Sequence, residues 1–225
     1  MKKIGYRSTN GLSEKVDFRT ALLRGQAPDK GLYMPDNIPS LSYDTIESMH
    51  KMAYSDIAFV VLNQFLENEM PSNELDRIVH EAYDFDVPIQ NVYERKHILW
   101  LDEGPTFSFK DLAARAMSRL MQYYMKNEQN RMTILTATSG DTGSAVANAF
   151  YGMDNIDCVV LFPEREVTEL QRRQMTTLGK NVRTYAVDGK FDDCQAIVKQ
   201  AFSDSELEHL NLSSANSINF GRLLP

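Results

Sequence analysis

One lysine stands where it could act as a nucleophile. Lys110 lies in the segment Gly104–Asp111, in which a Gly-Pro turn precedes the start of a helix. The positive end of the helix dipole repels a cation at this position, and Phe107 and Phe109 could exclude water, so the neutral amine is favoured. A neutral lysine amine forms a Schiff base with an aldehyde. From spacing alone, a solvated lysine in a first helical turn is the more frequent explanation.

A second segment, Thr136–Ser144, has the composition of an anion-binding loop. Its small hydroxyl residues and two glycines, Gly140 and Gly143, let backbone N–H groups approach an anion at a helix N-terminus. The segment lacks the Gly-Lys-Ser/Thr ending of a P-loop and the three spaced glycines of a dinucleotide site. A carboxylate or phosphate site and a plain capped turn remain equally open. Asp141 argues against a highly charged anion bound alone.

The first 85 residues show mainly helical patterns, with a short strand candidate at Ile4–Ser8. Ser42 and Ser55 are candidate N-caps of two helices, and Pro71-Ser72 opens a third. In this third helix four apolar residues fall on one face: Leu75, Ile78, Val79 and Ala82.

Strand and helix patterns alternate in the second half. The predicted order is a strand at 97–101, a helix at 111–126, a strand at 131–136, a helix at 144–151, a strand at 157–162, a capped helix from 168 to 179, a strand at 182–187 and a helix at 191–202. This alternation predicts an α/β fold with a parallel sheet. Because ligands bind at the carboxyl ends of parallel strands, both loops are expected at one site.

Composition excludes several kinds of partner. With 24 basic and 31 acidic residues the net charge is −7, which argues against nucleic acid as a main partner. No apolar run is long enough for a membrane helix, and the first residues predict no signal peptide, so no membrane partner is expected. Cys158 and Cys194 are the only cysteines and have no metal-ligand spacing. We therefore expect structural thiols, no metal site and a reducing, cytoplasmic setting, with a disulfide between the two cysteines as the open alternative.

A Schiff-base lysine beside an anion-binding loop is the arrangement of pyridoxal-phosphate enzymes that act on amino acids. The sequence resembles the N-terminal half of threonine synthases, which are fold-type II members of that group. Two long motifs carry the resemblance, Gly104–Asp111 and Leu135–Gly143. Shorter motifs agree with it: Ser8–Gly11, Gly31–Pro35, Asp188-Gly189 with Phe191-Asp192, and Asn216–Asn219 with Arg222–Leu224.

The resemblance implies a mainly helical N-terminal domain at 1–85. Part of an αβα pyridoxal-phosphate domain of the tryptophan-synthase-β type would follow at 86–225, with a βαβαβ subdomain at 130–213. The implied enzyme is a lyase of threonine biosynthesis that converts O-phospho-L-homoserine and water into L-threonine and phosphate. Pyridoxal 5'-phosphate is the implied cofactor, which would act as electron sink during γ-elimination and β-hydration.

The resemblance also implies roles for single residues. Lys110 would be the Schiff-base lysine and the proton shuttle. Asp141 would contact the cofactor, and the substrate carboxylate would be bound by Thr138, Ser139, Gly140, Asp141, Thr142 and Gly143. The substrate phosphate would be bound by Arg115, Asn216, Ser217, Asn219 and Arg222. The alternatives for this last group are a surface ion pair at Arg115 and a helix cap or turn at Asn216 and Asn219.

Two departures from the family pattern leave other functions open. Asp102 and Glu103 replace a Phe-His pair and would repel a phosphate if they faced inward; we expect them to face solvent. The chain also has about half the family's length, and it lacks the glycine-rich loop for the cofactor phosphate and the group that faces the pyridine nitrogen. We therefore expect an inactive fragment that binds cofactor weakly. The alternatives are a paralogue or other pyridoxal-phosphate lyase, and a non-catalytic binding module.

An unfinished sheet would also have a consequence for assembly. Ile134, Val159 and Val160 belong to the predicted sheet. If its other elements are missing, these apolar side chains form an exposed face, and we expect self-association through it.

Overall fold

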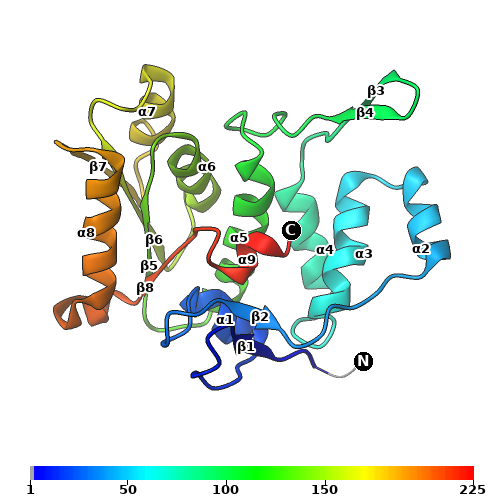
Figure 1. Cartoon of the computed structure of the whole chain (residues 1–225), viewed down its shortest axis with the longest axis horizontal. Coiled ribbons are helices and arrows are strands. Elements are labelled where there is room, and N and C mark those ends of the chain that lie inside the picture. The colour runs from blue at the N-terminus through cyan, green and yellow to red at the C-terminus, as the bar shows by residue number, and fades with distance from the viewer. Residues whose placement is uncertain (1–2) are drawn as a thin grey trace.

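The structure is a computed structural model that describes residues 3–225, so Met1 and Lys2 lie outside the described residues. A parallel sheet with its covering helices forms one side of the molecule, and helices from residues 43–82 form the other (Figure 1). Helix α5 (Lys110–Met125) stands between the two sides, beside the short helix α9 (Phe220–Leu223). The predicted α/β architecture with a helical N-terminal part is confirmed.

The regular secondary structure of the N-terminal part is helical apart from one small antiparallel pair of strands. Its elements are β1 (Tyr6–Ser8), α1 (Phe18–Arg24), β2 (Tyr33–Pro35), α2 (Tyr43–Ser48), α3 (Tyr54–Leu66) and α4 (Ser72–Ala82). Ser42 caps α2 by accepting a hydrogen bond from the Thr45 N–H. The prediction that Ser55 caps α3 is wrong, because that helix already begins at Tyr54 and Ser55 is buried in its first turn. The predicted apolar face of α4 is buried throughout.

Four parallel strands form the main sheet, in the order β7 (Val182–Val187), β6 (Ile156–Pro163), β5 (Met132–Ala137) and β8 (Leu212–Ser213). Successive side chains point to opposite faces. On β5, Ile134 joins the main core beside α6 (Asp141–Phe150), whereas Leu135 packs with Cys194 of α8 (Phe191–Ser203). The central strands β5 and β6 have no exposed residue, as is general for parallel sheets with helical crossovers, whereas the edge strand β7 is partly exposed.

The three apolar residues expected to form an exposed face of the sheet are covered. Ile134 and Val160 are fully buried, and Val159 packs against the cluster formed by Leu135, Leu161 and Cys194. The prediction that these three residues form an exposed apolar face is wrong, because helices cover the sheet on each side.

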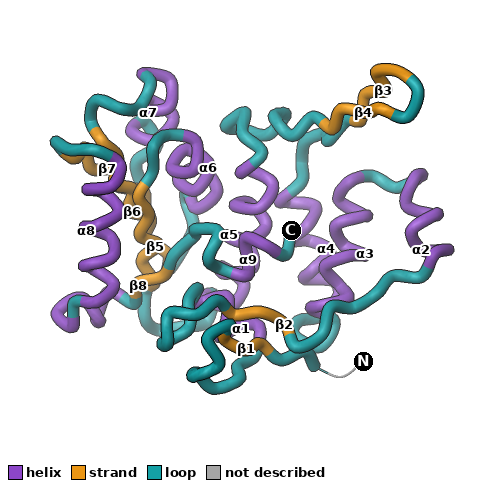
Figure 2. The backbone as a smooth tube through the Cα atoms, in the orientation of Figure 1, coloured by secondary structure: helices purple, strands orange, loops and turns teal. Residues whose placement is uncertain are grey.

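The strand predicted before the lysine motif lies outside the main sheet. It is β4 (Lys96–Leu99), which pairs antiparallel with β3 (Ile89–Tyr93) in a hairpin that stands apart from the sheet (Figure 2). Every residue of both strands is exposed. The hairpin is local because a tight turn, with Glu94 at φ 52°, brings its two strands directly together. Asp102 and Glu103 follow it and are exposed, as expected.

The main core extends from Tyr6 to Leu224 and is centred on α5, of which Ala116, Met117 and Met121 are fully buried. Cys158 and Cys194 are both free and buried, so the predicted structural thiols are confirmed. Within residues 3–225, no group of His, Cys, Asp or Glu side chains is arranged to hold a metal ion. No helix in this range is long and apolar enough to cross a membrane.

Candidate active site

A buried carboxylate shapes the lysine loop, which we define as residues 104–110. Asp111 is fully buried; its Oδ2 accepts a hydrogen bond from the Thr106 N–H at 2.8 Å and its Oδ1 one from Thr106 Oγ1 at 2.7 Å. Gly104 packs directly on the same carboxylate, since a Cβ atom there would lie 2.7 Å from Oδ2. These contacts fold the loop back onto the first turn of α5.

Lys110 is the first residue of α5, and its side chain reaches across to the other predicted loop. Its Nζ lies 3.4 Å from Asp141 Oδ2 and 4.3 Å from the centroid of the Phe109 ring. The prediction that Phe107 and Phe109 exclude water from the amine is wrong, because their side chains are 73% and 60% exposed. The polar residues Thr106 and Ser108 take the inward positions instead, where they bond to the start of α5.

The second loop, Thr138–Gly143, is called the glycine loop here. Thr138 is buried, and its Oγ1 accepts hydrogen bonds from the N–H groups of Gly140 at 2.9 Å and Gly143 at 2.8 Å. Its hydroxyl therefore shapes the loop from inside. Gly140 has φ 143°, a conformation that side chains other than glycine rarely adopt.

Helix α6 begins at Asp141, three residues earlier than predicted, so the glycine loop forms its first turn. Ser139 and Asp141 are exposed and Thr142 is half-buried. The backbone N–H groups of Asp141 and Thr142 have no acceptor among residues 3–225. Unpaired N–H groups at a helix start favour a bound anion, which is the property predicted for this loop.

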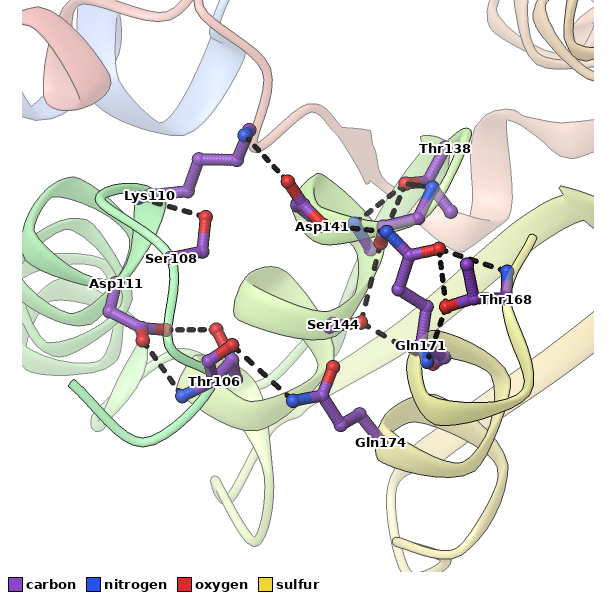
Figure 3. A network of polar contacts seen from close by, with 12 residues as sticks. Thr106, Ser108, Lys110, Asp111, Thr138, Asp141, Ser144, Thr168, Gln171 and Gln174 are labelled. Carbon is purple, nitrogen blue, oxygen red and sulfur yellow. Dashed lines mark hydrogen bonds and ion pairs between the residues drawn. The ribbon is translucent and has the colours of Figure 1, made fainter. Parts of the chain in front are cut away.

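Two glutamines of α7 (Glu169–Thr176) join the loops, and sequence reasoning missed both. Gln171 Nε2 donates to Asp141 Oδ1 at 2.7 Å, and Gln174 Nε2 donates to the Thr106 carbonyl at 3.3 Å (Figure 3). The i, i+3 spacing places the two amides on one face of the helix. The i, i+3 spacing of the two glutamines can be read from the sequence, but the sequence does not indicate which residues this face of α7 contacts.

The geometry thus brings an amine and an anion-binding helix start to one place. The glycine loop follows β5 at the carboxyl end of the parallel sheet, as predicted. The lysine loop follows the separate hairpin, so the prediction that it also ends a strand of that sheet is wrong. Packing of α5 on α6 brings the two loops together instead. An amine can bind an aldehyde covalently, and the helix start can bind a carboxylate or phosphate.

Comparison with known proteins decides the family. The family model described as "Pyridoxal-phosphate dependent enzyme" matches residues 98–221, which include both loops, and the model "Threonine synthase N terminus" matches residues 5–83. The chain belongs to the pyridoxal-phosphate-dependent enzymes. The two matches together also confirm the resemblance to the N-terminal portion of threonine synthases.

Relatives within this enzyme family are threonine synthases of bacteria and yeasts. That of Escherichia coli is 42% identical over 94% of this chain and 49% of its own length, and that of Schizosaccharomyces pombe is 34% identical over 99% and 46%. The solved structure of pyridoxal-phosphate-bound threonine synthase from Brucella melitensis superposes with a TM-score of 0.92 at 39% identity, covering 98% of this chain and 49% of that one. The chain spans about half the length of the curated relatives it matches.

Arg115 is predicted to bind a substrate phosphate, but in this pyridoxal-phosphate enzyme its side chain bonds to residues at the end of α4. Its guanidinium donates to the carbonyls of Ala82 at 2.7 Å and Glu81 at 2.9 Å, and to Asp84 Oδ1 at 2.6 Å. A cation is favourable at these final carbonyls of α4 because of the helix dipole. The ion pair named as the alternative is present, although the Arg115 side chain is only 10% exposed.

The segment Asn216–Arg222 packs against the middle of α5 through α9. Asn219 is fully buried and caps α9, which confirms the cap as its alternative role. Arg222 donates to the Ala215 carbonyl at 2.9 Å, and burial lowers the pKa of its guanidinium. Asn216 and Ser217 are exposed. The structure therefore joins Lys110 to the glycine loop, while the side chains of Arg115, Asn219 and Arg222 bond elsewhere.

Proposed function

We propose that this chain supplies the lysine-bearing part of a threonine synthase. The reaction converts O-phospho-L-homoserine and water into L-threonine and phosphate. The observation that carries this proposal is the approach of Lys110 Nζ to the first turn of α6, where Asp141 Oδ2 lies 3.4 Å away. The similarity to threonine synthases over nearly the whole chain supports the choice of substrate.

The residues present fit pyridoxal phosphate on its lysine side. The Lys110 side chain is 21% exposed and its Nζ has one hydrogen-bond acceptor among the described residues, so the amine is accessible to an aldehyde. Lys110 would hold the cofactor through Nζ, and Asp141 and the neighbouring N–H groups of the glycine loop would lie against it. When bound, the cofactor supplies an electron sink for bond breaking next to the substrate amino group.

The chain's own residues have distinct tasks in this proposal. The N–H groups of Asp141 and Thr142, with the exposed Ser139, would bind the substrate carboxylate at the start of α6. Lys110 Nζ would move protons at the substrate Cα and Cβ atoms, since it is the amine that reaches this position.

The substrate phosphate would be bound by side chains that are free to face it. Arg115, Asn219 and Arg222 donate their hydrogen bonds to groups of the chain itself. Asn216 and Ser217 are exposed and form the remaining candidates. Exposure of Asp102 and Glu103 removes the electrostatic objection to a phosphate substrate.

We also propose the division into a helical domain at 1–85 and a catalytic domain at 86–225, with a subdomain at 130–213. The matched ranges of the two family models, 5–83 and 98–221, support this division. The net charge of −7 supports a small-molecule substrate without nucleic-acid binding. A cytoplasmic location is proposed on the basis of the two free, buried thiols.

A chimaera tests the proposed reaction. Residues 1–225 would be joined to the part of the Escherichia coli threonine synthase that the match does not cover, and phosphate release from O-phospho-L-homoserine would be measured. The Lys110→Ala chimaera is the matched control. We expect phosphate and threonine in equal amounts from the parent chimaera and a loss of at least about a thousandfold in the variant.

Two outcomes would contradict the proposal. A folded, cofactor-loaded chimaera that releases no phosphate would exclude this substrate. Equal activity of the parent and the Lys110→Ala chimaera would remove Lys110 from the chemistry.

A further inference from the structure

Helix α7 touches both loops of the site although it carries none of the residues predicted for it. Gln171 bonds to Asp141 and Gln174 bonds to the Thr106 carbonyl. Gln171 also covers Gly140 closely, since a Cβ atom on Gly140 would lie 2.4 Å from the Gln171 amide. Ser144 Oγ bonds to the Gln171 carbonyl at 3.4 Å. The lysine loop and the glycine loop are therefore both tied to one short helix.

The amide of Gln171 has only one orientation that satisfies its neighbours. Its Oε1 accepts hydrogen bonds from the Thr168 N–H and from Thr168 Oγ1, each at 3.0 Å, because Gln171 is the third residue of α7 and completes a capping box with Thr168. The capping box thereby directs the amide nitrogen to Asp141, at 2.7 Å. The same side chain closes the start of α7 and donates to the site (Figure 3).

Asp141 is held at both oxygens as a result. Its Oδ1 accepts from Gln171 and its Oδ2 faces Lys110 Nζ at 3.4 Å. The Asp141 side chain is 52% exposed, so neighbouring atoms do not fix its rotamer by packing alone. The hydrogen bond from Gln171 therefore selects the rotamer in which the second oxygen points at the lysine.

We propose that Gln171 is a positioning residue that acts through Asp141 on Lys110. Without the Gln171 amide, the Asp141 side chain rotates freely in solvent and Lys110 Nζ loses a fixed partner. The inference rests on the proposed role of Lys110 as the residue that binds the cofactor aldehyde. It adds a residue from outside both loops to the machinery of the site.

The test uses the whole 225-residue chain and reads the lysine itself. The chain is treated with pyridoxal phosphate and then borohydride, and peptide mass spectrometry gives the labelling rate of Lys110 relative to the exposed Lys126. Asp141→Asn frees the amine from its carboxylate partner, so we expect labelling to rise about two- to fivefold, the range of a partly exposed ion pair. Gln171→Met is expected to give the same rise.

Two further variants separate positioning from helix capping. Thr168→Ala weakens the capping box but leaves the Gln171 donor, and we expect labelling to stay within about 1.5-fold of the parent, because the Asp141 contact survives. Adding Gln171→Met to Asp141→Asn is expected to change nothing more, since both act on one contact. Parent-like labelling in Gln171→Met, an equal rise in Thr168→Ala, or additive effects in the double variant would overturn the proposal.

A measurement on the unmutated chain covers the case in which Gln171→Met does not fold. The side-chain amide protons of Gln171 should resonate downfield of those of the exposed Gln200, because one of them is bonded to a carboxylate. Identical shifts would overturn the proposal. Neither readout requires turnover, so failure of the threonine synthase assignment and failure of this inference are distinguishable.

Discussion

Asn219 is bonded to Leu22 across 197 positions of the chain: its Nδ2 donates to the Leu22 carbonyl at 2.8 Å. The same amide nitrogen donates to the Ser214 carbonyl at 3.1 Å, and Oδ1 accepts from the Gly221 N–H at 2.8 Å. One buried side chain thus ties the end of α1 to the last loop and to the start of α9. Both polar atoms of the Asn219 side chain therefore bond to backbone groups of the chain itself.

Asn219→Ala should therefore destabilise the fold. The substitution leaves two buried carbonyls and one N–H without their partner, which we expect to cost about 2–4 kcal/mol of unfolding free energy. Asn216→Ala is the matched control, since Asn216 is exposed and its loss should change stability by less than about 0.5 kcal/mol. Urea unfolding followed by circular dichroism measures both. Equal stability of the two variants would show that the Asn219 contacts contribute nothing.

Asp111→Ala tests whether the hydrogen bonds from Thr106 to Asp111 hold the lysine loop in place. It removes the acceptor of both Thr106 hydrogen bonds in a fully buried position, and we expect a loss of about 1–3 kcal/mol. Thr106→Ser keeps the N–H and the hydroxyl and should lose less than about 1 kcal/mol. The measurement is thermal unfolding, with hydrogen exchange at the Thr106 amide as the local readout. Unchanged exchange in Asp111→Ala would contradict the contact.

Local signals in the sequence predicted the elements that depend on local contacts. The capping box at Thr168, the bounds of β7 and the buried face of α4 are confirmed. Each depends on residues a few positions apart, so the pattern itself contains the interaction. The predicted cap at Ser55 is wrong because α3 begins at Tyr54, two residues earlier than that cap requires, and buries Ser55 in its first turn.

Contacts between distant residues could not be predicted in the same way. Gln171 and Asp141 are 30 positions apart, and nothing local indicates that their side chains meet. The lysine loop was expected at a strand end of the sheet because a strand pattern precedes it, but that strand pairs with its neighbour in a hairpin. Polar side chains such as Arg115 present the same difficulty, since burial against another helix leaves no periodic signal.

Gly143→Ala tests the packing of the glycine loop on α7. An added Cβ atom would lie 2.4 Å from Thr138 Cγ2 and 2.7 Å from Met175 Sδ, so both side chains must move. We expect a loss of about 1–3 kcal/mol, as for other overpacked sites. Ser139→Ala, an exposed change in the same loop, is the control and should be near neutral. Chemical denaturation of both variants checks this, and a neutral Gly143→Ala would mean that the loop is loosely packed.

Glu69 should make stability depend on pH. Its side chain is 4% exposed beside Lys3, and burial raises the pKa of its carboxyl above the ordinary 4.5, although the hydrogen bond from Lys3 opposes the shift. A raised pKa means that the folded state holds the proton more tightly. The resulting stabilisation is present at acidic pH and is lost as pH rises through the folded pKa.

Glu69→Gln removes this titration. Relative to the parent, the variant should gain unfolding free energy as pH rises through the folded pKa of Glu69, because it places no ionised carboxylate in this buried position. Glu14→Gln, the same substitution at an exposed position, is the matched control. Denaturation at several pH values measures this. A difference that falls toward neutral pH would reverse the sign of the shift.

The main core joins residues that are far apart in the sequence, and this separation determines when it can form during synthesis. The core holds residues from Tyr6 to Leu224, and α9 packs on α5 and α1, so residues more than 190 positions apart share one interior. During synthesis on the ribosome, the helical hairpin of α3 and α4 can form early, but this interior cannot close until α9 has emerged. Long-range closure of this kind is slow. A nascent chain therefore carries α5 with an uncovered flank while residues 126–219 are being made.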